Sequence, residues 1–179
     1  MFNKILVALD RSEIGQQVFD QALDLAKATG ASLMLLHVLS AEEEGSPYVP
    51  ILSNFDYYPG LGAQSFEYYQ QQWESFKDEG LKMLQAFSAQ ANTAGVKTEF
   101  TQNLGLPGRL ICQIAVNWGA ELIVMGRRGR TGLAELFLGS VSNYVLHHAT
   151  CSVQIVHLPA SAPKAQEVVK EPSQTAIIG

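Results

Sequence analysis

The chain has 179 residues, of which 47% are hydrophobic and 16% are charged, and its formal net charge is −5. This is the balance of an ordinary globular protein, long enough to bury about 70% of the surface of its unfolded chain. The acidic charge disfavours non-specific binding to nucleic acid. Its cysteines, Cys112 and Cys151, lie in apolar surroundings and are expected to be reduced thiols.

The first apolar run, Ile5–Leu9, predicts a strand that is buried on both faces. It stops at Asp10, so it is too short for a signal peptide or a membrane span, and the simplest expectation is a cytoplasmic protein. Apolar residues then recur at helical spacing over residues 14–26. Asp10 or Ser12 is the candidate N-cap of this helix, and Gly30 is its expected stop.

Residues 32–38 predict a second buried strand. Residues 40–64 contain three consecutive glutamates, prolines and tyrosines without a clear period, so we expect a long loop. Such loops are uncommon in compact domains and are often functional. This one is a candidate lid over a ligand, a surface for a dimer mate, or a solvated insertion. An apolar and aromatic stripe over residues 66–91 then predicts a helix whose middle is weakened by Gly80.

Residues 96–101 predict a third strand, which is more polar and therefore nearer an edge of the sheet. Pro107 suits the first turn of the helix that follows, which runs to Trp118. Residues 121–126 form a predicted fourth strand that leads directly into a glycine-rich loop.

The last predicted helix begins at Gly139, and the last predicted strand covers residues 152–157. We expect residues 1–158 to form one domain. The tail, residues 159–179, is rich in Pro, Ala and Ser and is predicted to be disordered until it binds a partner.

Strands that alternate with helices predict an α/β fold with a parallel sheet, right-handed crossovers and helices on both faces. Ligands of such sheets bind outside the carboxyl ends of the strands, where the strand order reverses. Asp10, Val38 and Gly126 all stand at predicted carboxyl ends. One site can therefore include all three.

The segment from Met125 to Gly132, together with Gly139–Asn143, carries the chemistry of a phosphate site. Glycines let backbone amides approach a ligand, and a helix start offers free N–H groups and the positive end of its dipole. Three arginines, Arg127, Arg128 and Arg130, add positive charge. The loop is neither a Walker A sequence nor the Gly-x-Gly-x-x-Gly dinucleotide motif. A pair of glycines alone would equally suit a tight turn.

The spacing of Gly126, Gly129, Gly139 and Ser140 resembles the nucleotide signature of the universal stress proteins, in their ATP-binding subset. Further similarity lies in the segments at residues 4–12, 35–38, 105–111 and 153–156. The resemblance implies a single-domain, Rossmann-like open sheet of five strands in the order 3-2-1-4-5. It also implies that Asp10 lies beside the nucleoside and that the backbone of Val38 contacts the adenine edge.

The predicted ligand is ATP or AMP, with Mg²⁺ as a candidate companion held by the hydroxyl of Ser140 or Ser142 and phosphate oxygens. The resemblance also implies a homodimer through the strand at 152–157. The nucleotide-binding residues we predict are Ala8, Leu9, Asp10, Val38, Met125, Gly126, Arg127, Gly129, Arg130, Gly139, Ser140, Val141 and Ser142.

Catalytic constellations are scarce in the sequence. No nucleophile elbow or cluster of metal ligands is evident, and Asp10 lacks the second acid that a phosphoacceptor domain needs. His147 and His148 suit the end of a helix better than a metal site. We therefore predict a regulatory nucleotide-binding protein of the stress response, acting as a dimer on an unidentified protein partner. The alternatives are a slow ATPase or phosphoryl-transfer enzyme, and an interaction module whose nucleotide is structural.

Overall fold

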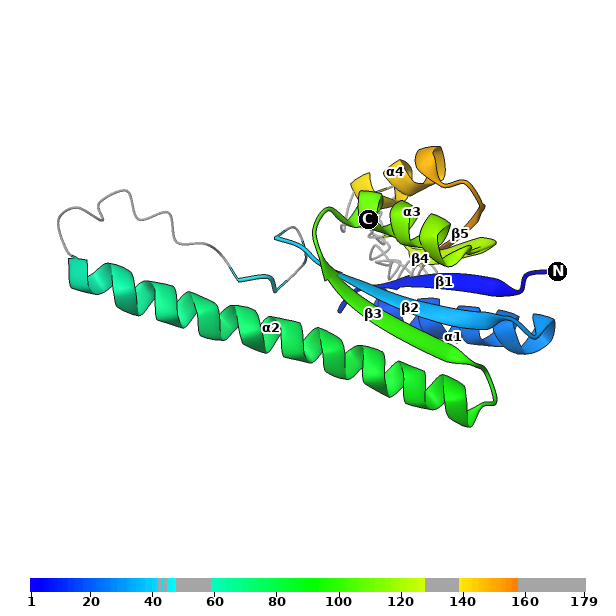
Figure 1. The fold of residues 1–179 in the computed structure, drawn as a ribbon, viewed down its shortest axis with the longest axis horizontal. Coiled ribbons are helices and arrows are strands. Elements are labelled where there is room, and N and C mark those ends of the chain that lie inside the picture. Colours follow the sequence, from blue (N-terminus) through cyan, green and yellow to red (C-terminus); the bar gives the residue numbers. More distant parts are fainter. Residues whose placement is uncertain (42, 44, 48–58, 128–138, 158–179) are drawn as a thin grey trace, which may run out of the picture.

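The structure is a computed structural model, and it describes residues 1–41, 43, 45–47, 59–127 and 139–157. Strands and helices alternate along the chain (Figure 1). The elements are β1 (Lys4–Leu9), α1 (Ile14–Thr29), β2 (Ser32–Leu39), α2 (Pro59–Thr93), β3 (Thr98–Leu104), α3 (Pro107–Trp118), β4 (Leu122–Gly126), α4 (Ser140–His148) and β5 (Ser152–Val156).

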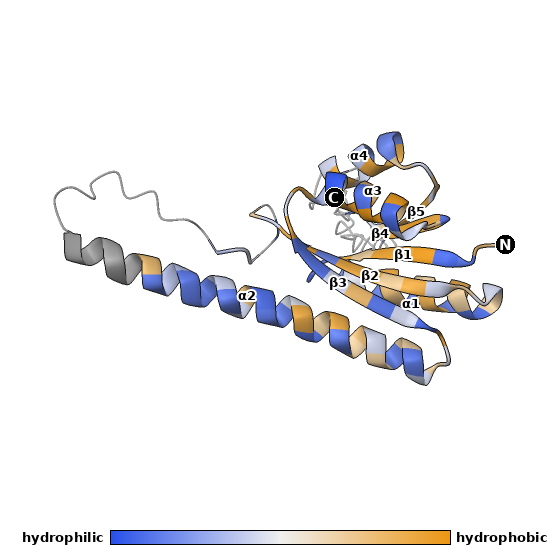
Figure 2. Cartoon of the chain, viewed as in Figure 1, coloured by the Kyte–Doolittle hydropathy of each residue, from blue (hydrophilic) through white to orange (hydrophobic). Residues whose placement is uncertain are grey.

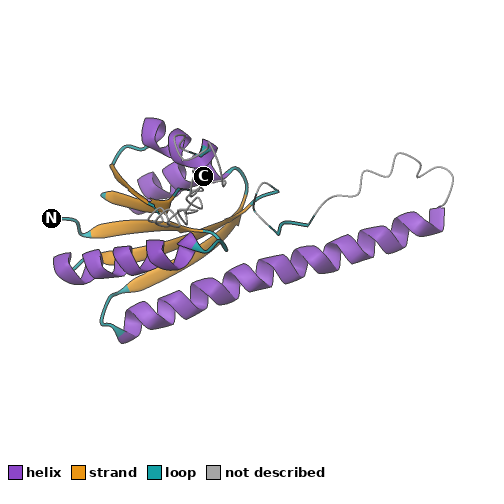
Figure 3. Ribbon diagram, turned by 180° about the vertical axis from the view of Figure 1, so that it is seen from behind, coloured by secondary structure: helices purple, strands orange, loops and turns teal. Residues whose placement is uncertain are grey.

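The strands form one parallel sheet in the order β3-β2-β1-β4-β5, which confirms the predicted fold class and strand order. Helices α1 and α2 cover one face, and α3 and α4 cover the other (Figures 1 and 3). The core consists of two apolar clusters, one on each face of β1, β2 and β4. Figure 2 shows this concentration of apolar residues in β1 and β2, while the edge strand β3 is more hydrophilic, as expected.

The prediction of a loop over residues 40–64 is wrong at its end, because α2 already begins at Pro59. The first residues of α2 include Pro59, Gly60 and Gly62, which give a weak local signal. A helix can nevertheless extend through such a stretch, because adding one residue to an existing helix loses less conformational entropy than forming the first turn. The third strand is also displaced: it runs over Thr98–Leu104 rather than residues 96–101.

The ends of the helices agree in part with those predicted from the sequence. Gly30 ends α1 in the left-handed conformation, and Pro107 stands in the first turn of α3, both as predicted. The predicted N-cap of α1 is wrong. Glu13 occupies that position without a side-chain bond, because the Asp10 carboxylate accepts instead from the amide and hydroxyl of Ser12.

Helix α2 is longer than the sheet that it covers, and its first half projects away from the body (Figure 1). Phe76, Leu84 and Ala91 are buried against the sheet. By contrast, none of residues 66–75 is buried. No helix in the described part of the chain combines the length and apolar character needed to cross a membrane. The tail at 159–179 lies outside the described residues, so its predicted disorder stays a prediction.

Candidate functional site

The strand order creates a switch point between β1 and β4. Strand β1 continues into α1 on one face of the sheet, whereas β4 is followed by α4 on the other face. The two connections therefore diverge at the carboxyl ends of adjacent strands, which is where ligands bind in open α/β sheets. This edge is the candidate site.

The end of β1 supplies three of the predicted residues. Ala8 pairs with Met125 of β4, and Leu9 pairs with His37 of β2. Leu9 and Met125 are buried, so they can contribute backbone rather than side chains to a ligand. Asp10 follows at once and is half-buried, with its carboxylate 3.2 Å from the amide nitrogen of Ser12. The sheet thus brings Ala8, Leu9, Asp10 and Met125 together at its carboxyl edge.

Strand β2 extends beyond β1. Its ladder with β1 ends at the pair Leu9–His37, while Val38 and Leu39 still pair with β3. The side chain of Val38 belongs to the core below α3 and α4. Only its backbone can face a ligand at the switch point.

Gly126 ends β4, and its lack of a side chain has a structural reason of its own. A Cβ atom at this position would lie 2.9 Å from Cγ2 of Ile14 and 3.2 Å from Cγ2 of Val18, both on α1. The glycine therefore lets α1 pack closely against the end of β4. The next residue, Arg127, donates its amide hydrogen to the Val156 carbonyl at 3.0 Å, which extends the ladder with β5. Gly129 and Arg130 lie outside the described residues, as does Arg128.

The start of α4 supplies the remaining predicted residues. Gly139 is the N-cap in an extended conformation, and the Asn143 amide makes the first intrahelical bond to its carbonyl. The amides of Ser140, Val141 and Ser142 precede that bond and have no intrahelical acceptor. Ser140 is exposed, whereas Ser142 is only 2% exposed and donates its hydroxyl hydrogen to the Gly139 carbonyl at 3.0 Å. Of the two serines, Ser140 presents its hydroxyl to solvent.

A buried polar cluster beside this site was missed by sequence reasoning. His37 is completely buried and contacts Glu43, which follows β2, and Gln102 of β3. Gly80 of α2 lies against the His37 ring, which explains a glycine in the middle of a helix. The only local signals were one histidine in an apolar strand and one glycine in a helical stripe. Neither signal identifies its partner in the sequence.

Other polar groups of the described residues form no second site. No group of three or more potential metal ligands occurs among them. His148 instead contacts the Tyr144 carbonyl at the end of α4. Both cysteines are free, and burial raises the pKa of Cys112 and of Cys151, which favours the unreactive thiol form.

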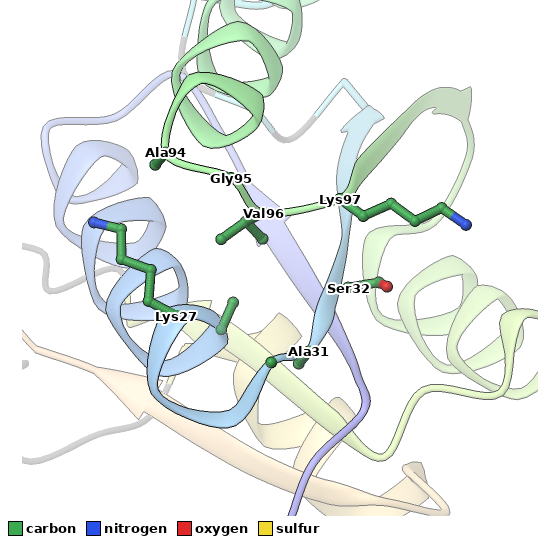
Figure 4. Close-up of a pocket in the computed structure, with 9 residues that line it drawn as sticks. Lys27, Ala31, Ser32, Ala94, Gly95, Val96 and Lys97 are labelled. Atoms are coloured by element: carbon green, nitrogen blue, oxygen red, sulfur yellow. The ribbon is translucent and has the colours of Figure 1, made fainter.

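A hollow of about 370 Å³ lies at the opposite edge of the sheet, where α1 and α2 end (Figure 4). Its two lysines, Lys27 and Lys97, extend to opposite sides of it rather than toward a common point (Figure 4). Two helix C-termini also place negative dipole ends there. The hollow therefore lacks the features of an anion site, and the carboxyl edge remains the candidate.

Fold and site together define a doubly wound α/β protein whose ligand edge lies between β1 and β4, with an open helix N-terminus beside it. Comparison with known proteins gives the family. The sequence pattern of the Universal stress protein family matches residues 1–157, so the chain belongs to this family. The chain is also 40% identical to universal stress protein Sll1388 of Synechocystis over 156 residues, covering 87% of this chain and 97% of that protein.

Solved structures of the family share the fold. A universal stress protein in complex with cAMP matches with a TM-score of 0.56 and 22% identity, covering 87% of this chain and 97% of the other. A universal stress protein from Archaeoglobus fulgidus in complex with dAMP matches with a TM-score of 0.55 and 18% identity, covering 86% and 96% of the two chains. At these identities the similarity establishes the fold alone.

Proposed function

We propose that this protein binds an adenine nucleotide at the carboxyl edge between β1 and β4, and that as a dimer it serves a regulatory role in the stress response. The observation that carries this proposal is the signature of Gly126, Gly129, Gly139 and Ser140. Two of its described members, Gly139 and Ser140, stand at a helix start with open amides. That combination suits a phosphate group.

The ligands of structural relatives support adenine as the base. The relatives solved with cAMP and with dAMP have in common an adenine, a sugar and one phosphate. In this chain, the phosphates would lie at the amides of Ser140–Ser142, with Arg127 and Arg130 supplying positive charge. The Asp10 carboxylate would accept hydrogen bonds from the sugar, and the Val38 backbone would face the base.

Replacing Gly139 with valine tests the placement of the phosphates. The added side chain would occupy the space where phosphate oxygens must approach the amides, so we expect AMP and ATP affinities to fall at least tenfold, about 1.4 kcal/mol. The measurement is isothermal titration calorimetry on folded protein. Thr150→Val, an exposed position just beyond the other end of α4, is the matched control. Unchanged affinity in folded Gly139→Val would refute this placement.

Slow ATP hydrolysis is the first alternative function. Phosphoryl transfer needs charge stabilisation, a metal anchor and an oriented nucleophile. The arginines and the start of α4 supply the first, and the exposed hydroxyl of Ser140 is a candidate for the second. Dedicated enzymes of this kind turn over at about 1–100 per second. We expect a rate far below this, with ATP retained during purification. A magnesium-dependent rate near one per second that Glu135→Gln abolishes would favour an enzyme instead.

The second alternative is an interaction module whose nucleotide is structural. Capturing partners from a lysate with and without ATP distinguishes this alternative from a regulator. A regulator binds its partner differently in the two conditions, whereas a structural nucleotide leaves the set of partners unchanged.

A further inference from the structure

The buried cluster around His37 has one consistent set of hydrogen bonds. The Gln102 side-chain nitrogen lies 3.0 Å from the Lys77 carbonyl oxygen and 3.0 Å from Nδ1 of His37. Because a carbonyl only accepts, this nitrogen is the amide donor, and Nδ1 of His37 must accept. His37 therefore carries its hydrogen on Nε2 and donates it to Glu43, whose two oxygens lie at 2.9 and 3.0 Å.

Glu43 uses its remaining acceptor capacity on the chain that follows β1. Its Oε1 lies 3.3 Å from the amide nitrogen of Arg11. Glu43 is only 5% exposed, so each bond replaces water that burial has removed. The Arg11 side chain is engaged elsewhere, because it pairs with Glu79 and lies 5.0 Å from the centre of the Phe76 ring. Glu43 thus connects the ends of β1 and β2 through one backbone amide.

The register of the sheet shows which acceptor the Arg11 amide would otherwise bond. In β2, the Ser32 amide bonds to Asn3 on the β1 side, and the Leu39 carbonyl accepts from Gly105 on the β3 side. Backbone groups of alternate residues point to alternate sides, so the Val38 carbonyl faces the β1 side. Continued beyond the pair Leu9–His37, the ladder would bond that carbonyl to the Arg11 amide. Glu43 accepts the hydrogen instead.

We propose that Glu43, held by His37, is a positioning residue that determines base specificity. By withholding the Arg11 amide, it leaves the Val38 carbonyl as an acceptor at the ligand edge. Such an acceptor favours a base with an exocyclic amino group, such as adenine, and opposes one with a carbonyl there, such as hypoxanthine, because two acceptors would face each other. This inference rests on the proposed nucleotide function.

Replacing Glu43 with glutamine tests the proposal. In either orientation of the glutamine amide, its NH₂ group faces His37 Nε2–H at one of the two positions that lie 2.9 and 3.0 Å from it, so two donors oppose each other. The side chain is then no longer held where it accepts from the Arg11 amide, and this amide becomes available to Val38. We expect wild-type protein to prefer AMP over IMP at least tenfold, and Glu43→Gln to lose roughly that factor for AMP with little change for IMP. The exposed Glu67→Gln on α2 is the matched control and should keep the preference. Titration calorimetry gives both affinities, and thermal melting establishes that each variant is folded.

The outcomes separate this proposal from the function on which it rests. An unchanged ratio of AMP to IMP affinity in folded Glu43→Gln overturns the specificity role alone. A wild-type protein that binds neither nucleotide overturns the proposed function and the specificity role with it.

Two measurements on ligand-free protein test the hydrogen bonds of His37 and Glu43 themselves. NMR should show His37 as the Nε2–H tautomer, and an Nδ1–H tautomer overturns the proposal even if Glu43→Gln does not fold. Exchange of the Arg11 amide hydrogen should change in Glu43→Gln, and an unaltered rate also overturns it.

Discussion

Gly126 shows how one residue can satisfy a ligand signature and a packing constraint together. The absence of Cβ lets Ile14 and Val18 of α1 approach the end of β4. The role of Gly126 in the phosphate site, taken alone, predicts that valine at this position blocks a ligand and leaves the fold intact. The structure corrects that expectation, because the new side chain would first meet α1.

The packing role of Gly126 predicts the outcome of a double-mutant cycle. We expect Gly126→Ala to lower the free energy of unfolding by about 1–3 kcal/mol, because its Cβ would overlap Cγ2 of Ile14. Ile14→Ala removes that methyl group, so the double variant should be less destabilised than the sum of the single variants. Urea unfolding measures all three. Simple additivity would show that the contact does not limit packing here.

Gly80 is a second glycine whose role depends on a distant residue. Alanine is favoured over glycine inside a helix by about 1 kcal/mol. At position 80, however, a Cβ would overlap the His37 ring and the Gln102 amide. We therefore expect Gly80→Ala to lower the free energy of unfolding, by about 1–3 kcal/mol in chemical denaturation. Gln85→Ala, at an exposed position of the same helix, should be close to neutral. A stabilised Gly80→Ala variant would contradict the packing described for His37.

At the scale of single elements, α2 divides into two parts that differ in how they pack against the sheet. Residues 76–91 include side chains buried against β2 and β3, whereas residues 66–75 contain none. The aromatic side chains of Tyr69, Trp73 and Phe76 stack along the helix, but only Phe76 is buried in the body. The apolar and aromatic stripe that predicts α2 from its helical period thus extends beyond the part of the helix that packs on the core.

This division predicts a gradient of hydrogen exchange along α2. Opening of a helix end without buried contacts costs much less than opening of a packed segment. We expect amides of residues 66–75 to exchange at least tenfold faster than those of residues 80–91, measured by NMR or mass spectrometry on ligand-free protein. Uniform protection along the helix would mean that another surface covers its first half.

At the scale of the whole molecule, the strand order leaves β5 at an edge of the sheet. A strand with unpaired backbone groups invites a second copy, and a two-fold axis would pair two β5 strands antiparallel. The homodimer inferred from family resemblance therefore stays our prediction, and β5 is its proposed interface. The bonds within the sheet identify which positions of β5 test it.

The ladder assigns opposite roles to neighbouring residues of β5. The Ser152 amide and the Val156 carbonyl form hydrogen bonds with β4, so the backbone N–H and C=O groups of even-numbered residues point toward β4. Those of Ile155 therefore point to the open edge. Proline at Ile155 should remove a bond between protomers and shift the dimer toward monomer. Val156→Pro should instead break the internal ladder and lower the melting temperature. Light scattering at micromolar concentration measures the first effect. A monomeric wild-type protein would contradict the dimer, and a dimeric, folded Ile155→Pro would exclude this interface.

The sequence by itself determined the features that depend on neighbours along the chain. The continuous apolar run of β1 and the periodic stripe of α1 established their elements, and Gly30 and Pro107 marked helix ends, because each signal acts within a few residues. The strand order and most of the candidate site came through the glycine spacing, which identified the family. The alternation of elements then placed Asp10, Val38 and Gly126 at one edge of the sheet.

Only the tertiary structure decided the features that depend on distant partners. Glu43, Gln102 and Gly80 meet at His37 because β2, β3 and α2 pack together, and no local pattern encodes that meeting. The second role of Gly126 likewise depends on how closely α1 approaches β4. The direction of each backbone amide in β5 follows from its register with β4. Register and close packing arise from contacts between segments far apart in the chain, so they become visible only once the sheet is assembled.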